Sequence, residues 1–302
     1  MIKGGVLEGL VGKVPRSTRN QVWRAVARSK RAAARPTAQW RTLPNYLIAG
    51  AQRCGTTSLQ RYLIEHPQVT PAGVMKGVHY FDTNDYHRGL DWYRSHFPTR
   101  RSIASMTERI GGTVLTGESS PYYMFHPLAP NRIVADLPGV KIVVLLRDPV
   151  DRAYSQYLHE TRRGYETLEF EPALEAEDGR LVGEAERMVA DPTYDSFSLR
   201  HHSYMARGEY FTQVRRLSDL VGQERLLVVS SEQLFDDPAA TYHNVLRFLG
   251  LPEFNPPGFA AQNANVYLSP ISNQARHMLE DRFREPNKLL YDFVGEDFGW
   301  SG

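Results

Sequence analysis

The stretch NYLIAGAQRCGTTSLQRYL, residues 45–63, decides the fold. Its first six residues form an apolar run that is typical of a buried strand ending in glycine. A glycine-rich turn follows, and residues 56–65 then show a helical pattern that stops at His66 and Pro67. A strand, a glycine-rich loop and a helix in this order predict an anion-binding turn at the edge of an α/β sheet.

The turn has the spacing G-x-x-x-x-G-T-T, from Gly50 to Thr57. A nucleotide triphosphatase carries lysine where this chain has Thr56. The backbone N–H groups of the loop and of the helix start still point toward an anion, and Arg53 can supply the missing positive charge. Kinases use that lysine together with Mg²⁺. The loop therefore predicts an anion site that needs no metal, and a P-loop kinase for a small molecule stays open as the alternative.

A second anion site is predicted in KIVVLLRDPVDRAYSQY, residues 141–157. Residues 141–147 form the clearest strand of the chain, and Asp148 and Pro149 then begin a helix as N-cap and first residue. Arg147 stands at the carboxyl end of the strand, where open α/β sheets bind ligands, and Ser155 lies about two turns into the helix. This pair suits one isolated phosphate. The alternative is a structural ion pair between Arg147 and Asp148.

Strands and helices alternate along the rest of the chain. Further strands are expected at residues 114–117 and 225–230, and further helices at 130–137, 238–249 and 272–294, the last with a break at Pro286. Residues 165–193 are acidic and are expected to form an irregular insertion over the active-site side. The alternation predicts a three-layer α/β fold, P-loop-like, with a central parallel sheet flanked by helices.

The length allows one large α/β domain or two small ones, and we expect a basic leader at residues 1–42 followed by one domain at residues 43–302. The chain has 302 residues, 41% of them hydrophobic, and no apolar run approaches the roughly 18 residues of a membrane span. Cys54 is the single cysteine, which fits a reducing, cytoplasmic compartment. The net charge of +2 is too small to indicate a nucleic-acid partner.

The basic leader allows two interpretations. Residues 19–34 could form a basic surface helix that contacts anionic lipid, which would place the protein at the membrane periphery. The thin apolar face of that helix favours the other interpretation, a flexible, solvated tail. Neither interpretation indicates an oligomeric state.

The two anion motifs, in this order, resemble the sulfotransferases that use 3′-phosphoadenosine 5′-phosphosulfate (PAPS), in particular the branch of the heparan sulfate sulfotransferases and their bacterial relatives. The resemblance runs from about residue 44 to residue 300. Four further segments are similar: HYFD at 79–82, GESSPYY at 117–123, MARGEY at 205–210 and NKLLYDFVGEDFGW at 287–300.

The resemblance implies sulfuryl transfer from PAPS, without metal, to a hydroxyl or amine of an acceptor that is a carbohydrate or a glycolipid. It implies that Arg147 and Ser155 hold the 3′-phosphate. It also implies that the loop residues hold the 5′-phosphosulfate, these being Arg53, Cys54, Gly55, Thr56, Thr57 and Ser58.

The sequence departs from this family at the general base. Relatives of this branch usually carry a glutamate after the lysine that corresponds to Lys76, and this chain has Gly77 there. His79, with an ordinary pKa near 6.5, is the first candidate to replace it, before His159 and Glu118. In an extended segment His79 would lie on the same face as residue 77, about 6–7 Å away. Lys76 and Arg53 would stabilise charge on the transferred group.

Several questions stay open at this point. Loss of the glutamate also fits a protein that binds the donor nucleotide without catalysis, and any of the histidines could be an ordinary packing residue. Aromatic side chains such as Trp92, Tyr93, Tyr122 and Tyr123 could stack on sugars, although most aromatic residues belong to a core. The sequence names neither the acceptor nor the choice between O- and N-sulfation.

Overall fold

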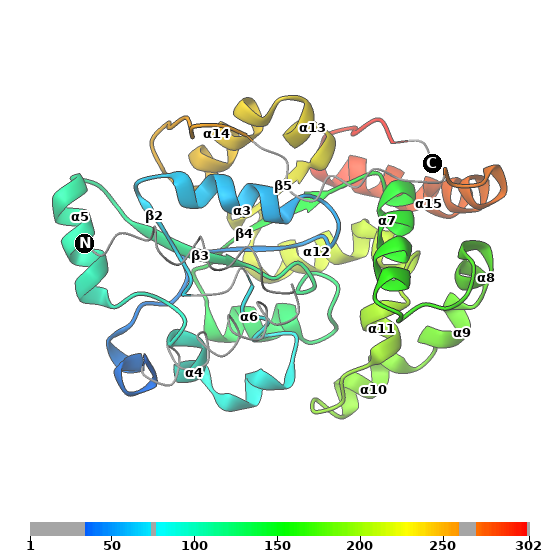
Figure 1. Ribbon diagram of the computed structural model, residues 1–302, viewed down its shortest axis with the longest axis horizontal. Coiled ribbons are helices and arrows are strands. Elements are labelled where there is room, and N and C mark those ends of the chain that lie inside the picture. The colour runs from blue at the N-terminus through cyan, green and yellow to red at the C-terminus, as the bar shows by residue number, and fades with distance from the viewer. Residues whose placement is uncertain (1–33, 74–76, 260–269, 301–302) are drawn as a thin grey trace, which may run out of the picture.

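The sheet at the centre of the molecule is parallel and five-stranded (Figure 1). The computed structural model describes residues 34–73, 77–259 and 270–300 of the chain. The strand order is β2-β3-β1-β4-β5, and all neighbouring pairs are parallel. The strands are β1 (Tyr46–Gly50), β2 (Val69–Pro71), β3 (Leu115–Ser119), β4 (Lys141–Leu146) and β5 (Leu226–Ser230). The predicted α/β fold with a parallel sheet is confirmed.

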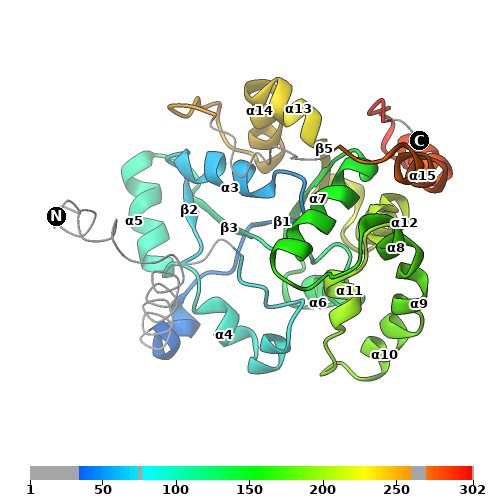
Figure 2. The ribbon, with the colours of Figure 1, turned by 45° about the vertical axis from the view of Figure 1, so that its right-hand side comes forward.

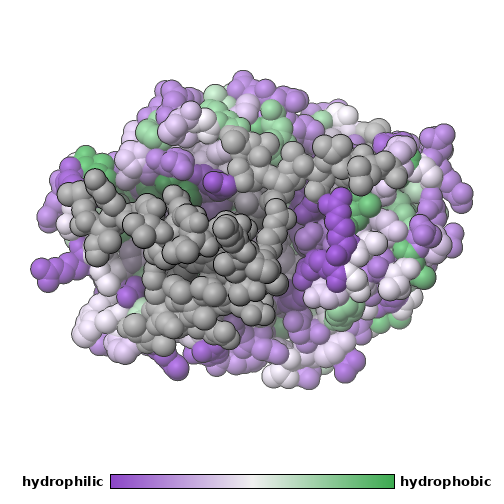
Figure 3. All heavy atoms as spheres, in the orientation of Figure 1, coloured by the Kyte–Doolittle hydropathy of each residue, from purple (hydrophilic) through white to green (hydrophobic). Residues whose placement is uncertain are grey.

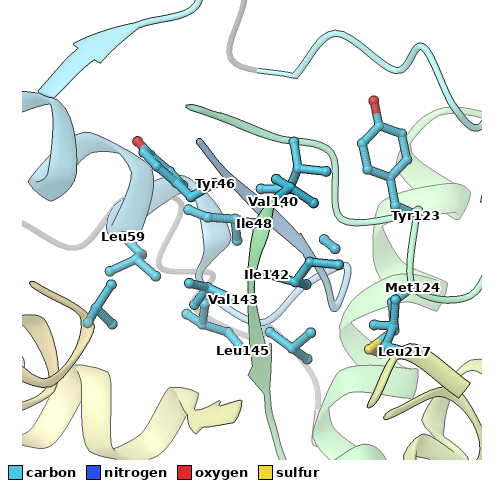
Figure 4. Close-up of a cluster of buried hydrophobic side chains, with 14 of the residues drawn as sticks. Tyr46, Ile48, Leu59, Tyr123, Met124, Val140, Ile142, Val143, Leu145 and Leu217 are labelled. Carbon is cyan, nitrogen blue, oxygen red and sulfur yellow. The ribbon is translucent and has the colours of Figure 1, made fainter. Parts of the chain in front are cut away.

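The central strands are apolar along their whole length because both faces of the sheet are covered. Every residue of β1 is buried, and so is β4 after Lys141. In Figure 4, Val143 and Leu145 point toward the side of Leu59, whereas Ile142 points toward Met124 and Leu217. This alternation along one strand shows that β4 fills two hydrophobic layers.

Helices form the outer layers of the sandwich (Figure 1). One face of the sheet is covered by α3 (Thr56–Glu65), α13 (Ser231–Asp236) and α14 (Pro238–Leu249). The other face is covered by α6 (Ala129–Asp136) and α12 (Tyr210–Val221), and α15 (Asn273–Val294) packs on α12. Where Figure 3 colours the surface, it is largely hydrophilic, with hydrophobic residues scattered over it.

The predicted helix boundaries at the motifs are confirmed. Helix α7 (Pro149–Arg162) begins as expected: the Asp148 carboxylate accepts a hydrogen bond from the Val150 N–H at 2.8 Å. Helix α14 ends at Gly250, whose φ of +79° is the left-handed conformation that glycine adopts without strain.

The acidic insertion is helical, so the prediction of an irregular segment is wrong. It contains α8 (Phe170–Glu175), α9 (Glu177–Leu181) and α10 (Glu184–Ala190), which lie with α11 (Phe197–His201) beside α7 (Figure 2). Phe170 and Leu174 are buried on α8, and the Glu166 carboxylate accepts a 2.6 Å hydrogen bond from Arg180. The acidic composition of this segment therefore reflects exposed helix faces and ion pairs such as this one, and not an irregular backbone.

Helix α15 runs through Pro286 without the predicted break. Proline removes one backbone hydrogen bond and normally interrupts a helix. Here Phe283, Asn287 and Leu290, spaced at four and three residues, are all buried on one face of the helix. Packing of this face compensates for the lost hydrogen bond, so the proline does not interrupt the helix here.

Several short elements were not predicted, because segments of three to six residues carry little periodicity. Strand β2 is one of them. The others are η1 (Arg35–Trp40), η2 (Asn84–Arg88), α4 (Leu90–Arg94), η3 (Ala206–Gly208), η4 (Gln223–Arg225) and the longer helix α5 (Arg100–Ile110).

The end of the basic leader contacts the domain. Ala38 of η1 is buried, and the Arg41 guanidinium donates a 2.7 Å hydrogen bond to the Phe97 carbonyl. Residues 1–33, with nearly all of the predicted basic helix, lie outside the described residues. Among the helices that the structure describes, none is both long and apolar enough to cross a bilayer.

Candidate active site

The two predicted anion motifs meet at the carboxyl edge of the sheet. Strands β1 and β4 are parallel neighbours, so the loop after β1 and Arg147 after β4 emerge at the same edge. The Ala51 N–H donates to the Leu145 carbonyl at 2.6 Å, and the Arg53 Nε donates to the Ser155 hydroxyl at 3.0 Å. Residues about a hundred positions apart in the sequence are thereby joined in one site.

The loop leaves the start of α3 open to a ligand. Gly55 precedes the helix with a φ of +82°, and Arg53 has a φ of +78°, which is unusual for a residue with a side chain. Within the described part of the chain, no side chain caps α3. The first N–H groups of the helix, with the positive end of its dipole, therefore face the position that an anion would occupy.

Not every predicted loop residue turns its side chain toward this position. The Cys54 thiol is buried, 4.0 Å from the Tyr210 hydroxyl, and burial raises its pKa to about 11. The side chains of Thr56 and Ser58 are also buried. Of the loop residues with side chains, Cys54, Thr56 and Ser58 are therefore buried, whereas Arg53 and Thr57 are partly exposed.

Arg147 forms an ion pair with a carboxylate of the helix that follows it. Its Nη2 lies 2.9 Å from the Asp151 carboxylate, in the first turn of α7, and the carboxylate of Asp148 caps that helix. The alternative of a structural ion pair at this arginine thus has its partner in Asp151. A phosphate that binds Arg147 would have to compete with Asp151, and it would meet Asp148, whose pKa is raised by burial to about 6.

At the end of β3, the strand next to β1, His79 forms a hydrogen-bonded pair with Asp82. The Nδ1 atom of His79 lies 2.8 Å from Oδ2 of Asp82, which is fully buried, while the His79 side chain is 45% exposed. Burial alone would lower the pKa of His79, but the charge and hydrogen bond of Asp82 raise it above the ordinary value. Asp82 received no role from the sequence; the spacing His-x-x-Asp within HYFD was the available signal.

The backbone of His79 is left-handed, with a φ of +53°. The expectation of an extended segment at this residue is therefore wrong. The Ser120 hydroxyl accepts a hydrogen bond from the His79 N–H at 3.0 Å, and the Thr83 hydroxyl donates to the His79 carbonyl. Such strained conformations persist only where neighbouring groups hold them. The imidazole is therefore held in a defined position by three neighbouring side chains.

Gly77 has no room for a side chain. A Cβ atom built on it would overlap the carbonyl oxygen of Ser119 and would lie 3.3 Å from Nε2 of His79. The imidazole of His79 therefore lies next to the place from which a side chain at position 77 would extend.

Glu118 is the buried centre of a hydrogen-bond network. One carboxylate oxygen accepts from the hydroxyls of Tyr93 at 3.2 Å and Tyr123 at 2.8 Å. The other accepts from the Val78 N–H at 2.9 Å and the Ser120 hydroxyl at 2.6 Å. Burial raises the pKa of Glu118, and these donors oppose the rise. With no exposed surface, Glu118 is placed to hold the segment that carries His79.

We expect Glu118→Gln to lower the free energy of unfolding by about 1–3 kcal/mol, because the new amide group would face hydroxyl donors where an acceptor stood. Thermal denaturation measures this. Glu253→Gln, at an exposed position, is the matched control and should change stability by less than about 0.5 kcal/mol. Equal melting temperatures for Glu118→Gln and the wild type would contradict the supporting role.

The other predicted residues lie differently. His159 is on α7, one turn beyond Ser155, and burial, followed by the charge of Arg53, lowers its pKa. Lys76 lies outside the described residues. The aromatic side chains that might have stacked on sugars are in the core, with exposed fractions of 5% or less: Trp92, Tyr93, Tyr122 and Tyr123.

The glycine-rich loop after β1 and the arginine after the neighbouring strand define a class: α/β proteins that bind a phosphorylated ligand at the carboxyl edge of the sheet. A family model described as a sulfotransferase domain matches residues 43–262. The chain therefore belongs to the sulfotransferase family, as the resemblance of its motifs implied.

Known proteins agree with this assignment. The chain is 31% identical over 218 residues to human bifunctional heparan sulfate N-deacetylase/N-sulfotransferase 3, covering 70% of this chain and 23% of that protein. It is 27% identical over 283 residues to mouse heparan sulfate glucosamine 3-O-sulfotransferase 3A1, covering 86% and 65%. The crystal structure of a sulfotransferase from Alicyclobacillus acidocaldarius is similar, with a TM-score of 0.63 and 28% identity, over 85% of this chain and 98% of that one.

Proposed function

We propose that this protein transfers a sulfuryl group from PAPS to a hydroxyl or amine of a carbohydrate, free or carried by a lipid. The observation that carries the proposal is the hydrogen bond from Arg53 to Ser155, which joins the two anion motifs into one site. One site of this kind suits a nucleotide with phosphate groups at both its 5′ and 3′ positions. The carbohydrate acceptor is supported by the heparan sulfate enzymes among the relatives.

In the proposed reaction, the acceptor oxygen or nitrogen attacks the sulfur in line with the bond to the leaving phosphate. The new bond to sulfur forms as the bond from sulfur to the phosphate oxygen breaks, and 3′-phosphoadenosine 5′-phosphate (PAP) leaves with the electron pair. Arg53 and the N–H groups at the start of α3 would stabilise the charge on the transferred group and the phosphate. We assign the same role to Lys76.

His79 is the proposed general base. Its Nδ1 is engaged by Asp82, which leaves Nε2 to accept the proton of the acceptor. Nε2 lies beside Gly77, the position of the glutamate in many relatives, so His79 would take over the task from a neighbouring residue. Asp82 would orient the ring and stabilise the imidazolium that forms, as a carboxylate does for histidine in a catalytic triad.

Turnover of radiolabelled PAPS with a panel of carbohydrate acceptors, in EDTA, tests the function. We expect labelled product, and calorimetry should show tight PAP binding that chelator does not change. A protein that binds PAP but labels no acceptor would instead be a nucleotide-binding protein without catalysis. Binding that favours ATP and needs Mg²⁺ would support the kinase alternative, against which the absent loop lysine argues.

The pH dependence of kcat/KM should report His79, because only the neutral imidazole accepts a proton. The rate should rise with pH through a pKa above 6.5, since Asp82 raises the pKa of His79. In Asp82→Asn this charge is lost, so the midpoint should move to lower pH while the maximal rate falls. A midpoint that stays in place in Asp82→Asn would exclude His79 as the titrating base.

A further inference from the structure

The MARGEY segment, residues 205–210, lies between the two halves of the donor site. Arg207 donates a hydrogen bond from Nη1 to the Gln52 side-chain oxygen in the phosphate loop. The hydroxyl of Tyr210 donates to the Arg147 carbonyl at 2.9 Å and lies 4.0 Å from the Cys54 sulfur. One short segment thus contacts the loop after β1 and Arg147, the residue that follows β4.

Arg207 is a buried cation. The residue is only 1% exposed. Its Nη2 donates to the Leu199 carbonyl at 2.7 Å, the Arg200 carbonyl at 3.0 Å and the Ser203 hydroxyl at 2.9 Å. Among the described residues, no ion pair joins Arg207 to a carboxylate, and the rings of Tyr122 and Phe125 face its guanidinium at 4.9 and 5.0 Å. Burial lowers its pKa to about 10, so it stays charged at neutral pH. Hydrogen bonds and ring contacts offset part of the cost of burying this charge, but no counter-ion within the described residues offsets the rest.

The backbone of the segment is firmly held. The buried carboxylate of Glu177 accepts from the N–H groups of Tyr204, Met205 and Ala206 at 2.7–2.8 Å. At position 208 only glycine fits, because a Cβ atom would lie 2.7 Å from ring carbons of Phe283. The insertion helix α9 and the C-terminal helix α15 therefore both fix the place from which Arg207 and Tyr210 extend.

We infer that residues 205–210 are a third part of the donor site, in which Arg207 positions the phosphate loop through Gln52 and Tyr210 positions the end of β4 through the Arg147 carbonyl. This inference rests on the proposed use of PAPS. Both are positioning residues, one for the 5′ side of the nucleotide and one for the 3′ side. The anionic donor also supplies the negative charge that Arg207 lacks in the protein.

Calorimetry with PAP and with adenosine 5′-phosphate, which lacks the 3′-phosphate, tests the inference. Binding of PAP by the wild type tests the proposed function first and separately. We expect Arg207→Met to weaken binding of both nucleotides by about tenfold, and Gln52→Ala to do so by a smaller factor. Tyr210→Phe should weaken PAP more than adenosine 5′-phosphate. A residue that only stabilised the fold would not separate the two ligands in this way.

Arg216→Met is the matched control, because Arg216 also donates to backbone carbonyls, those of Met124 and His126, without touching the loop. It should bind PAP within about twofold of the wild type. The double variant Gln52→Ala with Arg207→Met should bind PAP no more weakly than Arg207→Met alone. Unchanged PAP affinity in folded Arg207→Met, or additive losses in the double variant, would overturn the inference. If Arg207→Met does not fold, the Gln52→Ala and Tyr210→Phe variants test the inference instead. Unchanged PAP affinity in both of these variants would overturn it.

Discussion

Replacing His79 by alanine is expected to lower kcat by at least about 10² and to leave the Kd for PAP nearly unchanged. The imidazole is paired with the buried Asp82 through Nδ1, and its Nε2 lies 3.3 Å from the place of a Cβ at Gly77. Removing it leaves the acceptor without a base, whereas the donor loop is untouched. Single-turnover rates and calorimetry with PAP separate the two effects.

Two other histidines complete this experiment. His277→Ala is the matched control, since His277 is an exposed residue of α15, with a side chain that is 78% exposed. It should keep a normal kcat. A near-normal rate for His79→Ala combined with an inactive His159→Ala would assign the base to α7. If both variants kept their rates, neither histidine would be the base. An amine acceptor that needs no base would then be favoured over Glu118, which is buried and accepts four hydrogen bonds.

The second large effect is expected at the 3′-phosphate. Arg147→Ala should weaken PAP binding by about 10- to 100-fold, which corresponds to about 1.5–3 kcal/mol for one charge-assisted contact. The affinity for adenosine 5′-phosphosulfate, which has no 3′-phosphate, should change little. Calorimetry with the two nucleotides measures the difference.

Ser155→Ala should also weaken PAP binding, but less selectively. Its hydroxyl accepts the hydrogen bond from Arg53, so its loss also releases a side chain of the 5′ site.

Arg215→Ala is the control for Arg147→Ala. Arg215 and Asp219 form the same i,i+4 pair as Arg147 and Asp151, but on the exposed side of α12. Equal losses for both nucleotides in Arg147→Ala would show that Arg147 does not contact the 3′-phosphate.

The parts of the fold that depend on neighbours in the sequence were predictable. Strand β4 is an unbroken apolar run, Asp148 caps the helix that follows, and Gly250 ends α14. In each case the deciding interaction spans only a few residues, so the pattern contains it. The order of strand, loop and helix at residues 45–65 likewise predicted both the first anion site and the class of fold.

The orientation of individual side chains was less predictable. Cys54 belongs to the loop motif, yet its thiol is buried beside the Tyr210 hydroxyl. Arg147 forms an ion pair with Asp151, while the carboxylate of Asp148 caps α7. Motif membership assigns a residue to a site, but the packing around each side chain decides which way it points.

The sequence by itself determined the α/β class, the two anion motifs, the sulfotransferase resemblance and the loss of the usual glutamate at Gly77. Only the tertiary structure decided how these parts meet: the contact of Arg53 with Ser155, the pairing of His79 with Asp82, and the contact of Arg207 with Gln52. Tertiary packing also kept helix α15 continuous at Pro286. The physical reason is that local patterns encode backbone conformation over a few residues, whereas contacts across a hundred residues or more, and the packing that overrides a local rule, exist only once the sheet has brought distant segments together.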